Sequence, residues 1–309
     1  MMSNNLKGSL FMMFSMVTFA VEDMFIKAAA QTVPIGLVLV LFGLGGTTLF
    51  VLLTWKKNEQ VFHPALFSRP ILIRASCEIV GRLTFALAIT LTALSSASAI
   101  LQATPLVVAV GAAVFFKERV GIKRWIAITI GFVGVVFIIR PSVDGFDVMS
   151  LFAVIATLGF AGRDLATRAA PMALSHVQLG VYGFFVLIPA GLSLMFYHGD
   201  AFIINFSAAV QIACATVIGV IAYYSLTIAM RTGEVSVVSP FRYTRLVFAI
   251  IIGMVVFGET PDWMTMVGSL LIVSSGGYFL IHHRFEASAI TADIEESMVG
   301  QQTIKVVDK

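Results

Sequence analysis

The sequence predicts an all-α, polytopic membrane protein with ten transmembrane helices, arranged as two inverted five-helix repeats. Three observations predict this fold class: an apolar composition, ten long apolar segments, and a similarity between the two halves at one constant offset. Of the 309 residues, 59% are hydrophobic and 12% are charged, whereas soluble domains have about 45–50% apolar and about 25% charged residues. The mean hydropathy is +0.97. Because a soluble surface needs polar cover, this composition excludes a cytosolic enzyme, a fibre and a disordered chain.

Each apolar segment is long enough to cross the hydrocarbon core of a bilayer, which takes about 20 residues of α-helix. We expect helices near residues 6–28, 34–55, 71–92, 95–116, 122–140, 147–169, 176–197, 208–230, 236–257 and 263–282. The connections are short, except for a polar loop from Lys56 to Arg69. Residues 285–309 are polar and acidic, and we expect them to form a disordered cytoplasmic tail.

The basic residues of the loops predict the orientation in the membrane. Lys and Arg are enriched in cytoplasmic loops, so the side that holds more of them is expected to face the cytoplasm. That side, which includes the N-terminus, holds Lys7, Lys56, Lys57, Arg69, Lys117, Arg119, Lys123, Arg124, Arg231 and Arg284. The other side holds Lys27 and Arg140. Both termini are therefore predicted to be cytoplasmic.

An internal repeat appears when the first half is shifted by 141 residues onto the second. The shift places Ser9-Leu10-Phe11 on Ser150-Leu151-Phe152, Phe19-Ala20 on Phe160-Ala161, Asp23 on Asp164, Lys27 on Arg168, and Glu118 on Glu259. The predicted repeats are 6–140 and 147–284. Because each repeat crosses the membrane an odd number of times, the second is inverted relative to the first. Inverted repeats are typical of secondary transporters, which open a central cavity to either side in turn.

Several local patterns accompany this repeat. A run of small and aromatic residues precedes a lysine in the first helix, from Phe19 to Lys27. The fourth helix has Thr104-Pro105-Leu106 and ends in Phe115-Phe116-Lys117-Glu118-Arg119, and its counterpart ends in Phe257-Gly258-Glu259. The fifth helix has the glycine-spaced run Gly131-Phe132-Val133-Gly134. Over about residues 6–282 the chain resembles the drug/metabolite transporter superfamily, in particular its EamA-type members.

The resemblance implies a transporter of the bacterial inner membrane. Such relatives move amino acids, nucleobases, vitamins, adenosyl compounds or drugs, inward or outward. The first-helix variant Glu22-Asp23-x-Phe25-Ile26-Lys27 is similar to alphaproteobacterial members, some of which import riboflavin. Riboflavin uptake is therefore the best single expectation from the resemblance. Many relatives carry an arginine in the second helix, but the run from Leu39 to Gly46 has none, so contacts made by that arginine do not transfer.

Charged residues within the predicted helices mark the candidate site. Each costs about 2.5–3.5 kcal/mol on membrane insertion scales, so such residues normally face protein or a water-filled cavity. The candidate binding or gating residues are Glu22, Asp23, Lys27, Glu78, Arg82, Gln102, Asp164, Arg168, Tyr223, Arg242, Tyr243 and Arg245. Because Asp23–Lys27, Glu78–Arg82 and Asp164–Arg168 have favourable i,i+4 spacing, a purely structural pairing within each helix is the alternative.

Two features favour a functional interpretation. The Asp23 and Asp164 pairs recur at the repeat offset, and the inversion places them toward opposite faces, so each is expected near a gate. Arg242 and Arg245 follow Pro240, which removes a backbone donor and weakens the helix near a cavity. Charged residues form four clusters in the predicted helices: Glu22, Asp23 and Lys27; Arg74, Glu78 and Arg82; Arg163, Asp164 and Arg168; and Arg242 and Arg245. The seven bases and four acids of these clusters leave about three excess positive charges.

This charge balance predicts a planar or anionic cargo, because arginine forks suit carbonyl and carboxylate groups. Aromatic side chains that could stack on such a cargo are Tyr182, Tyr223, Tyr224, Tyr243 and Phe241. Gln102 and Gln178 could hydrogen-bond its edges.

Other classes of function lack a signature in the sequence. We find no convergent catalytic set, metal-ligand spacing or nucleotide-binding loop, so we expect neither an enzyme nor a cofactor. The expected partners are a small molecule and the lipid bilayer, not nucleic acid. A non-transporting membrane scaffold or a membrane-embedded enzyme is the rival from another class. The substrate, the direction of transport, proton or ion coupling and the oligomeric state stay open.

Overall fold

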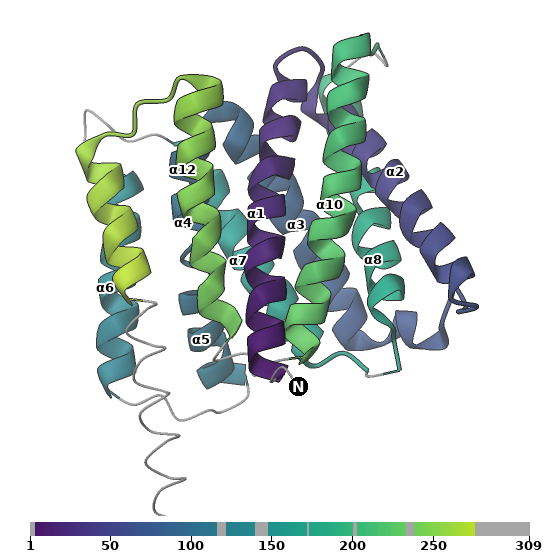
Figure 1. The fold of residues 1–309 in the computed structure, drawn as a ribbon, viewed down its shortest axis with the longest axis horizontal. Coiled ribbons are helices and arrows are strands. Elements are labelled where there is room, and N and C mark those ends of the chain that lie inside the picture. Colours follow the sequence, from purple (N-terminus) through teal and green to yellow (C-terminus); the bar gives the residue numbers. More distant parts are fainter. Residues whose placement is uncertain are drawn as a thin grey trace, which may run out of the picture.

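The computed structural model describes residues 4–115, 122–139, 148–171, 173–199, 203–232 and 238–275. Within these ranges the chain forms a bundle of helices (Figure 1). The elements are α1 (Asn4–Ala30), α2 (Ile35–Lys56), η1 (Pro64–Phe67), α3 (Arg69–Leu91), α4 (Leu94–Leu101), α5 (Thr104–Phe115), α6 (Ile122–Ile139), α7 (Ser150–Arg168), α8 (His176–Phe185), α9 (Leu187–His198), α10 (Phe206–Thr232), η2 (Ser239–Tyr243) and α12 (Thr244–Phe257). An unlabelled last helix spans Trp263–Ser275. The predicted tail, 285–309, lies outside the described residues.

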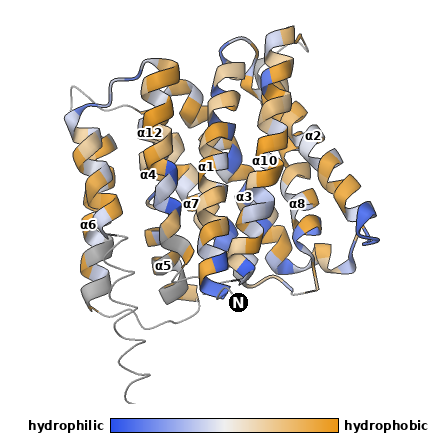
Figure 2. Cartoon of the chain, viewed as in Figure 1, coloured by the Kyte–Doolittle hydropathy of each residue, from blue (hydrophilic) through white to orange (hydrophobic). Residues whose placement is uncertain are grey.

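The elements confirm the predicted fold class of ten membrane-crossing segments. Five described stretches are long and apolar enough to cross a membrane by themselves: α1, α2, α7, α8 with α9, and α10. Figure 2 shows mostly apolar residues on helices such as α1, α2, α10 and α12, with strongly hydrophilic residues in the loop after α2. Since each half contributes five crossings, the halves run through the membrane in opposite directions.

Proline divides three of the crossings that the apolar pattern predicts as continuous helices. The fourth crossing is split into α4 and α5 at Gln102 and Ala103, just before Pro105. The seventh is split into α8 and α9 shortly before Pro189, and the ninth begins as the short 3-10 helix η2, which contains Pro240. Proline lacks the backbone donor that a continuous helix needs, so the break falls beside it. Only the interruption at Pro240 was expected from the sequence.

The principal interfaces join the two halves. Helix α1 packs along α10, and α3 packs along α7. These interfaces correspond under the repeat, because α1 is the counterpart of α7 and α3 is the counterpart of α10. The α3–α7 contact depends on small residues: a Cβ added to Gly159 would lie 2.6 Å from the backbone nitrogen of Gly81. Small residues let membrane helices approach this closely.

The remaining helices flank this centre. Helix α2 packs against α8 and α9, and α12 packs against α1 and α4. At the far edge of the bundle, α6 lies beside the last helix (Figure 1), where a Cβ added to Gly134 would lie 2.7 Å from the Gly268 carbonyl oxygen. Among the described residues, the buried charged side chains lie on α1, α3, α7 and η2.

Candidate functional site

A central cavity of about 40 Å³ lies between the two halves. The helix break that ends α4 contributes Gln102 to it, and both halves contribute arginines. The lining residues are Met16, Phe19, Arg82, Leu101, Gln102, Thr104, Pro105, Phe160, Arg163, Leu226, Arg242 and Arg245. This volume has room for only one or a few water molecules. A cavity of this volume is too small for a metabolite.

Two repeat-equivalent aspartates bind arginines of one short segment. Asp23, on α1, lies 2.5 Å from Nη2 of Arg245. Asp164, on α7, lies 2.7 Å from Nη1 of Arg242 and 2.9 Å from Nη2 of Arg163. The Asp23 contact joins the two halves, whereas the Asp164 contacts lie within the second half. The segment from η2 into α12 thus connects α1 to α7.

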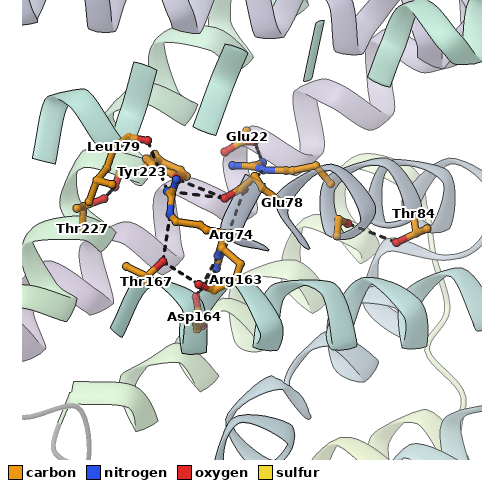
Figure 3. A network of polar contacts seen from close by, with 12 residues as sticks. Glu22, Arg74, Glu78, Thr84, Arg163, Asp164, Thr167, Leu179, Tyr223 and Thr227 are labelled. Atoms are coloured by element: carbon orange, nitrogen blue, oxygen red, sulfur yellow. Dashed lines mark hydrogen bonds and ion pairs between the residues drawn. The ribbon is translucent and has the colours of Figure 1, made fainter. Parts of the chain in front are cut away.

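A second network surrounds Glu78 on α3, which is fully buried (Figure 3). Its carboxylate lies 3.4 Å from Nη1 of Arg163 and 3.5 Å from Nε of Arg82. The Tyr223 hydroxyl donates a hydrogen bond to Glu78 at 3.2 Å and accepts one from Arg74. A buried carboxylate is stable only when it is paired and hydrogen-bonded, and these partners supply both interactions.

Glu22 completes the pairing of the cavity arginines. This fully buried residue of α1 accepts a hydrogen bond of 2.6 Å from Nη1 of Arg82. Aromatic rings cover the guanidinium planes: Arg82 and Arg245 lie 5.5 Å and 5.3 Å from the Phe19 ring centroid. Arg163 lies 4.7 Å from the Phe160 centroid. Because Phe19 and Phe160 are repeat equivalents, the cavity has a related aromatic wall on each side.

Lys27 binds the other half of the protein at the end of α1. Its Nζ lies 3.0 Å from Oε1 of Glu259 and donates a hydrogen bond of 2.9 Å to the Thr92 carbonyl. The Glu259 carboxylate also accepts hydrogen bonds from the backbone N–H groups of Leu94 and Ser95, at 2.7 Å and 3.1 Å. Burial works to raise the pKa of Glu259, but these hydrogen bonds outweigh it and hold the pKa below its usual range.

An open vestibule of about 440 Å³ lies at this end of the bundle, with Lys27 and Glu259 in its wall. On α1, Phe19, Asp23 and Lys27 follow one another at four-residue steps, which place them on one face of the helix. The Asp23–Arg245 and Lys27–Glu259 contacts therefore lie in sequence between the cavity and the vestibule. We call these two contacts the paired latch.

The intrahelical pairing considered for Asp23 is wrong, because Asp23 binds Arg245 and Lys27 binds Glu259. A neighbouring helix supplies the partner of Asp23, so packing decides this pairing. The Glu78–Arg82 pair has the i,i+4 contact, at 3.5 Å. Asp164 binds Arg163 and Arg242. The side chain of Arg168 lies outside the described part, so the Asp164–Arg168 pairing stays a prediction.

The expected excess of three positive charges decreases when an acid from a loop is included. Glu259 neutralises Lys27, so six arginines and four carboxylates of the sequence-defined clusters leave two positive charges in excess. The case for a strongly anionic cargo is correspondingly weaker.

Several polar residues considered as cargo contacts, on α8 and α10, instead bind the end of α2 and the loop that follows it. Gln178 donates to the Gln60 carbonyl at 2.7 Å, and the Tyr182 hydroxyl donates to the Val61 carbonyl at 2.8 Å. Tyr224 lies beside Lys57, at 3.4 Å from its Nζ. Tyr223 belongs to the Glu78 network, and Tyr243 is buried without a hydrogen-bond partner among the described residues. Of the proposed polar edge contacts, Gln102 is the one that lines the cavity.

Two residues of the site were not among the candidate binding or gating residues. Arg163 lines the cavity and joins Glu78 to Asp164, but it was counted only as part of a charge cluster. Its position within an apolar helix was the available signal. Glu259 ends an apolar span in the sequence, and its equivalence to Glu118 was the available signal.

The fold and the site define a class of protein: a multi-pass membrane protein whose two inverted halves enclose an arginine-lined cavity. The chain belongs to the EamA-like transporter family, whose profile matches it twice, at residues 6–140 and 148–281. It is therefore a transporter and not an enzyme. A solved crystal structure shares the fold, with a TM-score of 0.65 and 15% identity over 90% of this chain and 98% of its own.

Curated relatives are bacterial transporters with different substrates. The chain is 27% identical to a riboflavin transporter of Vibrio cholerae over 57% of its length, and 27% identical to one of Rhizobium johnstonii over 60%. The matched stretches span only 59% and 61% of those two proteins. An S-adenosylmethionine uptake transporter of Rickettsia felis is 23% identical over 67% of this chain and 70% of its own length.

Proposed function

We propose that this protein is a secondary transporter of the bacterial inner membrane that takes up riboflavin, or a related planar metabolite, by alternating access. One observation carries the mechanism: the repeat-equivalent Asp23 and Asp164 bind Arg245 and Arg242 beside a cavity between the halves. A change in these contacts alters the packing of both halves on the same segment. Binding of cargo at the arginines is thereby coupled to movement of the halves.

The paired latch acts as the gate on one side of the cavity. Both of its contacts join α1 of the first half to the end or the beginning of the α12 segment in the second. These helices separate only when both contacts break. The distribution of basic loop residues predicts that this end faces outward, so the paired latch would close the cavity toward the outside. The inversion of the repeat predicts that the Asp164 region faces the cytoplasm.

The choice of riboflavin rests on the relatives and on the chemistry of the cavity. Two of the most similar curated proteins are riboflavin transporters. A flavin ring is flat and carries carbonyl and ring-nitrogen acceptors, which suit arginine donors and stacking on guanidinium planes. The cavity of about 40 Å³ must widen to admit it, and separation of the two halves supplies that space.

Uptake of S-adenosylmethionine is the second candidate, because a relative that aligns over two thirds of the chain has that activity. The two candidates differ in charge: riboflavin is uncharged at neutral pH, whereas S-adenosylmethionine carries a sulfonium cation. Amino acids, nucleobases and export remain further alternatives within transport. Transport of each of these candidates can be measured in the same cells expressing the protein.

The test is growth rescue of a bacterial riboflavin auxotroph that lacks its own riboflavin transporter. The gene should restore growth at low riboflavin and accumulate radiolabelled riboflavin, compared with the empty vector. The Asp23→Asn variant, expressed to the same level in the membrane, should lose this uptake. Rescue equal to the empty vector, with the protein present in the membrane, would reject riboflavin. Full uptake by charge-neutralised variants would reject the proposed mechanism.

A further inference from the structure

The charged groups at the surface of the cavity are all of one kind. Among the described lining residues, the charged ones are the arginines Arg82, Arg163, Arg242 and Arg245. The carboxylates that neutralise them are not among the lining residues. Incoming cargo therefore meets the arginine hydrogen-bond donors in the cavity wall. A cationic group would meet no carboxylate in this described wall, whereas an acceptor would meet several donors.

Two of these arginines have a donor without a hydrogen-bond partner. The Nε atoms of Arg82 and Arg242 are buried and make no hydrogen bond with any described residue. Arg82 binds Glu22 at 2.6 Å through Nη1, and Arg242 binds Asp164 at 2.7 Å through Nη1. The Nε atom of Arg82 also lies 3.5 Å from Oε1 of Glu78, an ion pair without a hydrogen bond. A buried donor without a hydrogen bond is unfavourable. An acceptor atom that reaches Nε would relieve this cost while the Nη1 contacts stay in place.

The existing ion pairs also bear on the charge of the cargo. Each lining arginine already lies within 3.4 Å of a carboxylate oxygen. An anion must compete with these buried carboxylates, whereas an uncharged acceptor needs only an N–H group. The stacked rings of Phe19 and Phe160 further favour a flat partner.

Building on the proposed transport function, we propose that the cavity selects an uncharged planar ring with carbonyl or ring-nitrogen acceptors and rejects cations. The Nε–H groups of Arg82 and Arg242 are the specificity-determining donors. This assignment separates the two candidate substrates suggested by the relatives: it favours an uncharged flavin over the S-adenosylmethionine cation.

Substitution by lysine tests the donors, because lysine retains the positive charge and removes the Nε–H group. In proteoliposomes that contain the full chain, Arg82→Lys and Arg242→Lys should each raise the KM for riboflavin about tenfold, as expected for one lost hydrogen bond to a charged donor. Arg231→Lys is the matched control, because Arg231 lies outside the cavity and binds the Leu174 carbonyl. Its KM should change less than twofold. Unchanged KM values in both cavity variants would overturn the assignment of the donors.

A panel of labelled solutes tests whether the cavity selects uncharged cargo and rejects cations. The same panel distinguishes failure of this inference from failure of the proposed transport function. The probes are riboflavin, uracil, flavin mononucleotide and S-adenosylmethionine, each offered to the same proteoliposomes. Uptake of an uncharged ring, with no uptake of the cation, supports the inference. Transport of S-adenosylmethionine, or a preference for the anionic mononucleotide over riboflavin, overturns the inference and leaves the transport function intact. Uptake of none of the four overturns the proposed function and, with it, this inference.

Discussion

Asp23 and Asp164 lie 141 residues apart and occupy equivalent positions in the two halves, yet they bind arginines only three residues apart, Arg245 and Arg242. The two aspartates are therefore equivalent under the repeat, but the two arginines that bind them are not. One segment, from η2 into α12, holds both of them. Any movement of α1 relative to α7 must strain or break at least one of these two contacts.

Neutralising either aspartate should impair transport strongly. Removal of one partner from a buried ion pair leaves the other charge uncompensated, which costs about 3–5 kcal/mol. We expect Asp23→Asn and Asp164→Asn each to reduce riboflavin uptake at least tenfold, measured per amount of protein in the membrane. Asp262→Asn is the matched control, because Asp262 caps the last helix by accepting from Thr265 and asparagine caps as well. Wild-type uptake in both cavity variants would contradict the mechanism.

Loosening the paired latch should open the cavity toward the vestibule. In a chain with Cys77 and Cys214 replaced by serine, a Met16→Cys probe lies in the cavity wall, and Met16 is fully buried. Glu259→Gln weakens the contact with Lys27, so a membrane-impermeant maleimide should label the probe several-fold faster from the outside. Glu59→Gln, at the loop after α2, should leave the labelling rate unchanged. An unchanged rate in Glu259→Gln would exclude this contact as a gate.

The paired latch should be insensitive to pH in the physiological range. The pKa of Glu259 lies below its usual value of 4.5, so the contribution of its charge to closure is present above that value and is lost only as pH falls through the lowered pKa. Labelling of the Met16→Cys probe, normalised to an exposed cysteine, should therefore be flat between about pH 5 and pH 8. An increase on lowering the pH from 8 to 6 would assign gating to another titrating group.

The inverted arrangement predicts that equivalent helix ends reach opposite faces. Gln31 follows α1 and Ala169 follows α7, and both side chains are exposed. A cysteine at residue 31 should react with an impermeant reagent added outside intact cells, and a cysteine at residue 169 should react only after permeabilisation. Reaction of both from the same side would contradict alternating access. If residue 169 reacts from the outside and residue 31 reacts only after permeabilisation, the halves are still inverted, but the predicted orientation in the membrane is reversed.

Hydropathy and the repeat offset predicted the architecture because both are properties of long stretches of chain. The membrane requires about 20 apolar residues per crossing, so the sequence alone revealed the ten crossings. The partners of the buried charges were less predictable. Spacing suggested Asp23–Lys27, but Lys27 binds Glu259, which is more than 200 residues away. The partner of a buried charge depends on which helices pack together, and the spacing of residues along one helix does not determine this.

The helix breaks between α4 and α5 and between α8 and α9 were also not predictable from the sequence. Pro105 and Pro189 are visible in the sequence, but a proline within an apolar stretch is compatible with either a bend or a complete break. At Pro105 the break matters because it brings Gln102 to the cavity. Gln102 was nevertheless predicted correctly as a polar residue that could face cargo, because few polar side chains occur in that apolar run.

The location of Arg242 and Arg245 also bears on how the gene came to be duplicated and fused. At the equivalent positions the first half has Leu101 and Thr104, so two copies of that half could not neutralise their aspartates in this way. Two copies of the second half would instead bring four such arginines together around a pair of aspartates. Divergence after fusion has thus made each half obligate for the other, and an ancestor built from two identical chains must have balanced its buried charges differently.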